Sequence, residues 1–179
     1  INFLSISSTL NNPHAQFLLG LIYYDGKYVA QDINKAIYYL VPAANKNHLN
    51  AQYVLGLVYY LRENKVVDIN KAIYYFTLAS NQNHSYSQFL LGLIYYLGEF
   101  LPTDIRKSIY YLMLASNQND SDAQFLLGTI YLKGYYIKQD LNQAFYYLTL
   151  AANQNHSEAQ YNLGIIYYDG IYTEKNINK

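Results

Sequence analysis

The feature that most constrains this chain is a ten-residue motif that occurs five times at intervals of 36 residues. It reads A-Q-F-L-L-G-L-I-Y-Y at 15–24, and its copies begin at residues 51, 87, 123 and 159. The glutamine and the glycine of the motif keep this spacing in every copy: Gln16, Gln52, Gln88, Gln124 and Gln160, and Gly20, Gly56, Gly92, Gly128 and Gly164. A period of roughly 20–50 residues is typical of stacked supersecondary units, each of which buries its apolar face against its neighbours. The period therefore predicts a solenoid.

Each copy of the motif lies on the first of two predicted helices in its repeat. Ala15, Leu19 and Ile22 follow helical spacing and share one face. The glycine within this helix costs about 1 kcal/mol relative to alanine, so we expect it to allow a partner helix to approach closely. We expect capping boxes at the start of three copies: Ser85 with Gln88, Ser121 with Gln124, and Ser157 with Gln160. The predicted first helices span 13–25, 49–61, 85–97, 121–133 and 157–169.

The second helix of each repeat is predicted to begin after an aspartate N-cap and to end at an asparagine in the left-handed conformation. These residues are Asp32, Asp68, Asp104 and Asp140, and Asn47, Asn83, Asn119 and Asn155. Ala36 and Leu40 belong to the predicted buried stripe, and Pro42 is expected to kink the first copy of this helix. Glycines that suit a helix C-cap end the first helices: Gly26, Gly98, Gly134 and Gly170. Arg62 takes this place in the second repeat, where we expect a strained or different closure.

The period also divides the chain into repeats. We expect residues 1–13 to be the end of a preceding repeat, because Phe3, Leu4 and Ser7 match residues one period later. The predicted repeats are 14–49, 50–85, 86–121 and 122–157, with a partial repeat at 158–179. We therefore expect the chain to be part of a longer array.

The composition excludes several function classes. The 12 basic and 12 acidic residues cancel, which argues against binding to nucleic acid or to an anionic membrane surface. No apolar run approaches the roughly 20 residues that span a bilayer, so we expect no membrane insertion. The chain has no cysteine, which excludes disulfides and thiolate chemistry. The compartment is left open: a cytoplasmic location is slightly favoured, and a secretory lumen is the alternative.

The motif positions carry a family resemblance over essentially the whole chain. The pattern A-Q-x-x-L-G-x-x-Y-x-x-G, followed by D-x-x-K-A and a terminal A-A, resembles the Sel-one-like repeat (SLR) family, a relative of the tetratricopeptide repeat. The resemblance implies an α/α right-handed superhelical solenoid that serves as a scaffold or adaptor. The second loop glycine of the family is replaced here by Tyr28, Asn64, Phe100, Tyr136 and Tyr172. This departure predicts a different turn between the two helices.

By analogy with the tetratricopeptide groove, positions 14, 17, 21, 24 and 25 of the first repeat and their equivalents are expected to face a concave surface. This gives a tyrosine-rich candidate groove for a peptide or helix: Phe17, Tyr24, Tyr53, Tyr60, Tyr86, Phe89, Tyr96, Phe125, Lys133, Tyr161 and Tyr168. The alternative is that these rings pack one repeat on the next, an explanation that we favour for the Phe17 row and not for the Tyr24 row. Positions that differ between repeats are expected to set specificity: His14, Asn50, Tyr86, Asp122 and Glu158.

The sequence indicates no catalytic, cofactor or metal site. Of the four histidines, His48, His84 and His156 occupy one equivalent loop position, where the remaining repeat has Asp120, and the fourth is His14. Packed helices lie roughly 10 Å apart, which we expect to be too far for shared metal ligation. The aspartate row that begins at Asp32 is explained by helix capping, and no nucleophile or phosphate-binding motif occurs.

The leading hypothesis is a non-enzymatic protein–protein interaction scaffold that holds a partner segment in its groove. The alternative is a regulatory or spacer region of a larger enzyme, such as a kinase or effector, with its catalytic domain outside this sequence. End-to-end self-association of the chain is a third hypothesis.

Overall fold

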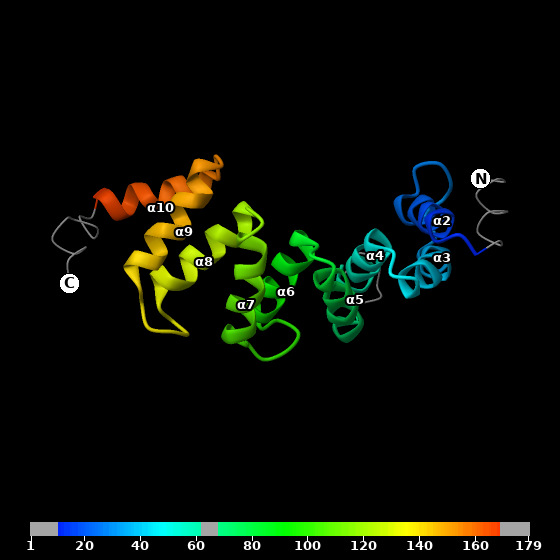
Figure 1. Ribbon diagram of the computed structural model, residues 1–179, viewed down its shortest axis with the longest axis horizontal. Coiled ribbons are helices and arrows are strands. Elements are labelled where there is room, and N and C mark those ends of the chain that lie inside the picture. Colours follow the sequence, from blue (N-terminus) through cyan, green and yellow to red (C-terminus); the bar gives the residue numbers. More distant parts are fainter. Residues whose placement is uncertain (1–10, 62–67, 169–179) are drawn as a thin grey trace. The chain divides into compact units, whose positions relative to one another are not determined.

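The computed structural model describes residues 11–61 and 68–168, and all regular structure within these ranges is helical. Helices follow one another as hairpins along the chain (Figure 1). The first helices of the repeats are α2 (Pro13–Asp25), α4 (Leu49–Tyr60), α6 (Ser85–Leu97), α8 (Ser121–Lys133) and α10 (Ser157–Tyr168). The second helices are α3 (Ile33–Asn45), α5 (Ile69–Asn81), α7 (Ile105–Ser116) and α9 (Leu141–Asn153). The predicted all-α helix-turn-helix repeat is confirmed.

The chain forms two compact units, Ile1–Ser87 and Gln88–Lys179, and the boundary falls within α6. Within the first unit, α3 packs on both α2 and α4. Within the second unit, α8 packs on α7 and α9, and α9 packs on α10. Each unit therefore repeats the same arrangement of a helix hairpin packed on its neighbour.

The second helices begin as the sequence predicts. Asp32 has an extended backbone, and its Oδ1 accepts a hydrogen bond from the Lys35 N–H at 3.0 Å. Asp68, Asp104 and Asp140 cap their helices in the same way. The Lys35 ammonium lies 3.3 Å from Asp32 Oδ2, and the Lys35 backbone N–H is the main cause that lowers the pKa of this carboxyl. Local sequence is sufficient to start these helices.

The predicted capping boxes of the first helices are wrong. The residue before each of these serines supplies the cap: Asp120 Oδ1 accepts from the Ala123 N–H at 2.9 Å, and His84 Nδ1 accepts from the Ser87 N–H at 3.1 Å. His48 and His156 cap through Nδ1 as well, and Asn12 caps α2. The serine is therefore the first residue of the helix, and the glutamine side chain is available for another contact.

That contact joins successive repeats. Gln52 is 1% exposed, and its Nε2 donates to the Ala44 carbonyl, the last turn of the preceding repeat, at 3.1 Å. Its Oε1 accepts from Gln82 Nε2 at 2.7 Å. Gln124 repeats this pattern in the second unit, with the Ser116 carbonyl and Gln154. The recurring glutamine thus satisfies a buried carbonyl at the joint between repeats.

The helix ends follow the prediction where the structure describes them. Asn47, Asn83, Asn119 and Asn155 have φ between 60° and 64°, and Gly26, Gly98 and Gly134 are also left-handed. In the second repeat α4 ends one residue earlier than predicted, and Leu61 is extended, with φ −79° and ψ 124°. Helix α3 continues through Pro42 to Asn45, so the proline does not end it. The expectations for residues 1–10, Arg62 and residues 169–179 lie outside the described residues.

In the described hairpins a buried side chain of the second helix packs against the motif glycine: a leucine in three of them, and Phe76 against Gly56 in the α4–α5 hairpin. Leu40, Leu112 and Leu148 are fully buried. A Cβ at Gly20 would lie 2.5 Å from Leu40 Cγ, and one at Gly128 would lie 2.7 Å from Leu148 Cγ. A real Cβ does not fit at these distances, so the motif glycine sets how closely the two helices of a hairpin approach. The predicted role of this glycine is confirmed for Gly20, Gly56, Gly92 and Gly128, whereas a Cβ at Gly164 would meet no neighbouring helix that the structure describes.

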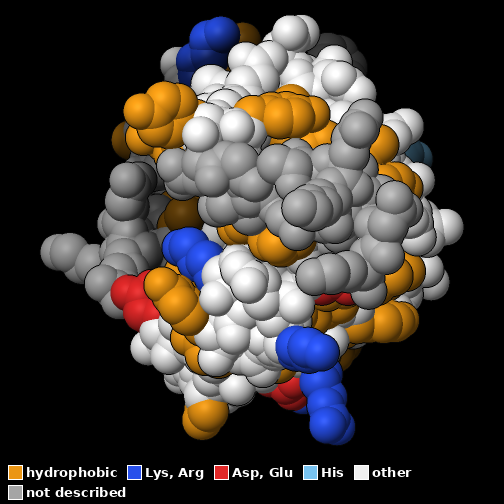
Figure 2. Space-filling model, turned by 90° about the vertical axis from the view of Figure 1, so that its left-hand side faces the viewer, with side chains coloured by type: hydrophobic (Ala, Val, Ile, Leu, Met, Phe, Trp, Pro, Cys, Tyr) orange, Lys and Arg blue, Asp and Glu red, His pale blue; other side chains and the backbone are white. Residues whose placement is uncertain are grey.

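The surface carries few charges and many tyrosines. The face in Figure 2 shows orange hydrophobic side chains scattered among white polar ones, with few blue and red groups. Among the described residues most of the exposed large hydrophobic side chains are tyrosines, including Tyr38, Tyr74, Tyr110 and Tyr146 at one repeated position. Exposed tyrosines offer apolar area and a hydroxyl group for hydrogen bonding.

Candidate functional site

A hollow of about 270 Å³ lies over the first helices of the second unit. Its lining residues are Phe89 and Leu93 of α6, Asp122, Phe125 and Leu126 of α8, and His156 and Glu158 at the start of α10. Apart from Leu126 and the cap residue His156, they occupy positions 14, 17 and 21 of the repeat, which the sequence predicts to face a partner. The structure thus brings Phe89 and Phe125, both predicted site residues, to one cavity.

The rim of this hollow is acidic. His156 lies between two carboxylates, with Nε2 3.3 Å from Asp122 Oδ1 and Nδ1 3.4 Å from Glu158 Oε2. The side chains of Asp122 and Glu158 are 54% and 68% exposed. The Ser157 hydroxyl donates to Glu158 Oε2 at 2.8 Å and is the main cause that lowers the pKa of Glu158. Both carboxyl groups therefore face solvent at the rim of the hollow.

The Phe17 row lies at the joints between repeats. Phe17 stacks on His48, the cap of the next repeat, with ring centroids 4.7 Å apart, and Phe125 stacks on His156 at 4.6 Å. Tyr53 packs on His84 at 4.6 Å in the same way. At the joint between the third and fourth repeats the cap of α8 is Asp120, so Phe89 has no cap ring to stack on. The row therefore supports the stacking of repeats at the same time as it lines the first-helix surface.

The predicted site residues differ in exposure. Seven of them are half-buried: Phe17, Tyr24, Tyr53, Tyr60, Phe89, Tyr96 and Phe125. Four are exposed: Tyr86, Lys133, Tyr161 and Tyr168. Tyr60 packs edge-on against Phe76 at 6.2 Å, and Tyr96 packs against Tyr136 at 6.1 Å. Tyr60 and Tyr96 of the Tyr24 row thus keep part of each ring accessible while the other part packs within a unit, whereas Tyr168 is almost fully exposed.

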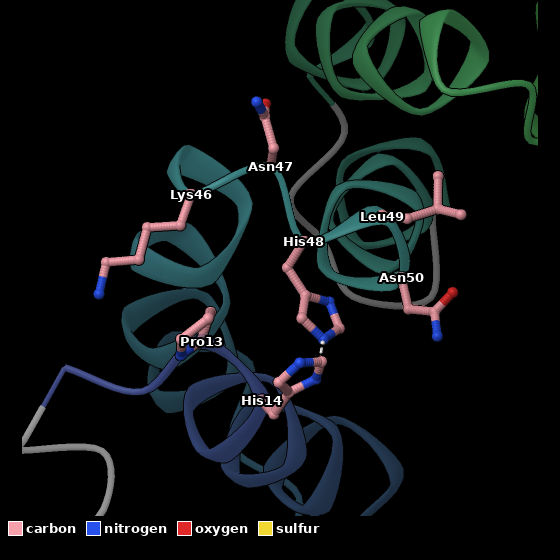
Figure 3. Close-up of a pocket in the computed structure, with 7 residues that line it drawn as sticks. All are labelled: Pro13, His14, Lys46, Asn47, His48, Leu49 and Asn50. Carbon is pink, nitrogen blue, oxygen red and sulfur yellow. Dashed lines mark hydrogen bonds between the residues drawn. The ribbon is translucent and has the colours of Figure 1, made fainter.

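A second hollow, of about 350 Å³, lies beside a histidine pair in the first unit (Figure 3). His48 Nε2 and His14 Nδ1 are 3.1 Å apart, and the two rings meet edge to face. Lys46 extends away from the pair and its Nζ contacts Asn11 (Figure 3). Burial, and next the neighbouring His14, lower the pKa of His48. Both effects favour the neutral form of His48.

The expectation that histidines of successive repeats lie too far apart to share a ligand is wrong for this pair. His14 belongs to a helix and His48 to the cap of the next first helix, so they are not at equivalent positions. Nδ1 of His48 accepts the Ala51 N–H at 3.3 Å, which assigns the ring proton to Nε2 and leaves it to donate to His14. A shared metal ion would require the opposite tautomer and the loss of this cap. The described residues hold no group of three histidine, aspartate or glutamate side chains that could bind a metal ion.

Sequence reasoning missed a second aromatic row on the second helices. Tyr23 and Tyr39 stack with centroids 5.9 Å apart, and Tyr38 meets Tyr39 edge-on. The Lys35 ammonium lies 5.2 Å from the Tyr23 ring centroid. The stack recurs with Tyr59 and Tyr75, Tyr95 and Tyr111, and Tyr131 and Tyr147. The signal was the Y-Y pair that recurs in every second helix.

Comparison with protein families decides the identity of this repeat. The Sel1 repeat model matches residues 13–48, 49–84, 85–120, 121–156 and 157–179. The chain belongs to the Sel1 repeat family. The resemblance inferred from the motif is thereby confirmed. Sel1 repeat proteins are typically protein–protein interaction modules and generally non-enzymatic scaffolds.

Solved structures of other Sel1 repeat proteins share the fold. A protective antigen of uropathogenic Escherichia coli with an SLR fold is 27% identical, with a TM-score of 0.86, over 94% of this chain and 36% of its own. A Sel1 repeat protein from Oxalobacter formigenes is 30% identical, with a TM-score of 0.78, over 94% of this chain and 69% of its own. Cysteine-rich protein B of Helicobacter pylori is 28% identical, with a TM-score of 0.55, over 75% of this chain and 96% of its own.

No curated protein matches the chain. The chain spans about a third of the length of the Escherichia coli antigen. Among the described helices, none has the length and apolar character needed to cross a membrane.

Proposed function

We propose that this Sel1 repeat chain is a non-enzymatic interaction module that binds a segment of a partner protein on its first helices. The observation that carries the proposal is the hollow over α6, α8 and α10, which is lined by repeat positions 14, 17 and 21. Phe89, Phe125 and His156 contribute aromatic rings to an opening that a protruding side chain can enter, and apart from the acidic rim the chain carries few charged residues. Aromatic-rich, weakly charged surfaces are typical of protein interfaces.

The half-buried Tyr24 row extends this surface within each unit. Tyrosine presents a large rigid area and a hydroxyl group at low cost in side-chain entropy. Tyr60 in the first unit and Tyr96 in the second have packed ring edges, so their orientation is set before a partner binds. Preorganised side chains lose less freedom on binding, which favours affinity.

A peptide-display selection against the whole chain, followed by two double variants, tests this proposal. Tyr60→Ala with Tyr96→Ala removes first-helix rings, and we expect the affinity for the selected peptides to fall at least tenfold. Tyr74→Ala with Tyr110→Ala removes exposed rings from α5 and α7 and serves as the matched control, with affinity unchanged. Circular dichroism checks that both variants remain folded.

Unchanged affinity in the first-helix variant would overturn the proposal. A selection that yields no peptide able to bind the wild-type chain would also count against it.

A further inference from the structure

We infer that the hollow of the second unit receives an arginine side chain of the partner segment. The inference deepens the proposed function and rests on it, because it names the chemistry that the first-helix surface would recognise at one point.

The floor of the hollow is apolar. Phe89, Leu93, Phe125 and Leu126 contribute hydrocarbon surface from two neighbouring first helices. Its volume of about 270 Å³ is below the roughly 300–1,000 Å³ of pockets for drug-sized ligands, and it suits a single long side chain. The methylene stem of a basic residue packs on such a surface while its charged end stays at the rim.

The rim has the charge to hold a cation. Asp122 projects from α8 and Glu158 from α10, and both remain more than half exposed. Both carboxylates lie within 3.4 Å of a ring nitrogen of His156, and among the described residues neither forms an ion pair with a lysine or arginine. A partner cation would therefore meet two anions whose charges no basic side chain neutralises.

The arrangement favours arginine over lysine. The two carboxylates lie on either side of one imidazole, so a planar guanidinium with several N–H groups can donate to both. A guanidinium also stacks on aromatic faces, and two phenylalanines line the hollow. The ammonium group of lysine is a compact point charge, so it matches the two separated carboxylates and the aromatic faces less well than a guanidinium does.

The acidic rim is specific to this part of the chain. The position held by Asp122 and Glu158 carries His14, Asn50 and Tyr86 in the other repeats. The cap at the joint that follows Phe89 is Asp120, where the other described joints between repeats carry a histidine ring. The position that supplies the rim thus carries two carboxylates in the second unit and none in the first, so the side chain that this hollow selects differs from what the first unit selects.

Nuclear magnetic resonance titrations of the whole chain test the inference. The probes are N-acetyl-arginine methylamide, its lysine counterpart, and the uncharged citrulline counterpart, at constant ionic strength. We expect the arginine probe to cause saturable shifts of the Phe125 and His156 ring signals. We expect the citrulline probe to bind at least tenfold more weakly and the lysine probe to fall between them.

Asp122→Asn with Glu158→Gln should weaken the arginine probe at least tenfold, because the shape of the hollow is kept while its charge is lost. Asp25→Asn, an exposed carboxylate outside the hollow, is the matched control and should change nothing. The absence of saturable shifts, equal binding of citrulline, or an unaffected double variant would overturn the inference. Lysine binding as tight as arginine would overturn the choice of arginine.

The outcome separates this inference from the proposed function. If the arginine probe fails while selected peptides still depend on Tyr60 and Tyr96, only the arginine site is lost. If the probe binds but no peptide depends on those tyrosines, the site stands as a small-ligand pocket and the proposed function fails.

Discussion

At the scale of single residues, the motif glycine illustrates how one side chain sets the geometry of a hairpin. Gly128 and Gly164 occupy the same position in successive repeats. A Cβ at Gly128 would collide with Leu148, whereas no atom lies within 4 Å of the Cβ position at Gly164. Packing therefore requires a glycine at Gly128. Nothing that the structure describes requires one at Gly164.

This contrast predicts opposite effects of alanine. Gly128→Ala adds a methyl group to a closed contact, which costs about 1–3 kcal/mol and outweighs the gain of about 1 kcal/mol in helix propensity. We expect a net loss on the order of 1 kcal/mol in the free energy of unfolding. Gly164→Ala should raise it by up to about 1 kcal/mol. Urea unfolding of both variants measures this, and an equal gain in both would contradict the packing argument.

At the scale of elements, the starts of the first helices depend on histidine. His48, His84 and His156 accept a backbone N–H through Nδ1, which requires a neutral ring. Burial lowers the pKa of His48 and of His84 below the usual value for histidine. At the start of α8 the cap is the carboxylate of Asp120, which accepts the Ala123 N–H in place of a histidine ring.

The histidine caps predict that the free energy of unfolding falls on acidification from about pH 6.5. Below this pH the unfolded chain binds protons at histidines whose pKa is lowered in the folded state, so protonation favours unfolding. Replacing His84 by aspartate, as at Asp120, should make the fall between pH 6.5 and 5 less steep. Urea unfolding between pH 5 and 8 measures this, and an unchanged slope would show that the His84 cap does not contribute.

How far the sequence predicts these elements depends on how far apart the interacting residues are. The aspartate caps and the left-handed asparagines were predicted because each depends only on residues a few positions away in the sequence. Gln124 was assigned to a capping box, whereas its side chain bonds to the Ser116 carbonyl of the preceding repeat and to the Gln154 side chain at the end of α9. Such partners are chosen by the packing of helices, which the local pattern does not contain.

The same limit applies to the candidate site. The motif and the family analogy together predicted that positions 14, 17 and 21 would share a face, and these positions line the hollow of the second unit. That Asp122 and Glu158 would flank His156 was not predicted, because the three belong to two repeats and to different positions within them. The contact of His14 with His48 escaped prediction for the same reason.

At the scale of the whole molecule, the chain uses one Sel1 hairpin repeatedly and varies what the hairpin presents. Glycine–leucine contacts join the two helices of a hairpin in both units, and buried glutamines and aromatic–histidine stacks join neighbouring repeats. The position held by His14, Asn50, Tyr86, Asp122 and Glu158 on the first helices changes from repeat to repeat, and at one hollow it forms an acidic rim. Under the proposed function, this changing position sets what each part of the surface recognises.

The central claim is that a partner binds the first helices rather than the second. Site-specific photocrosslinking with benzoylphenylalanine tests it most directly, because Tyr86 of α6 and Tyr74 of α5 are matched exposed tyrosines in the same unit, 42% and 56% exposed. With a peptide selected on the whole chain, we predict crosslinks from position 86 and none above background from position 74. Crosslinks from position 74 alone, or in equal yield from both, would contradict the claim.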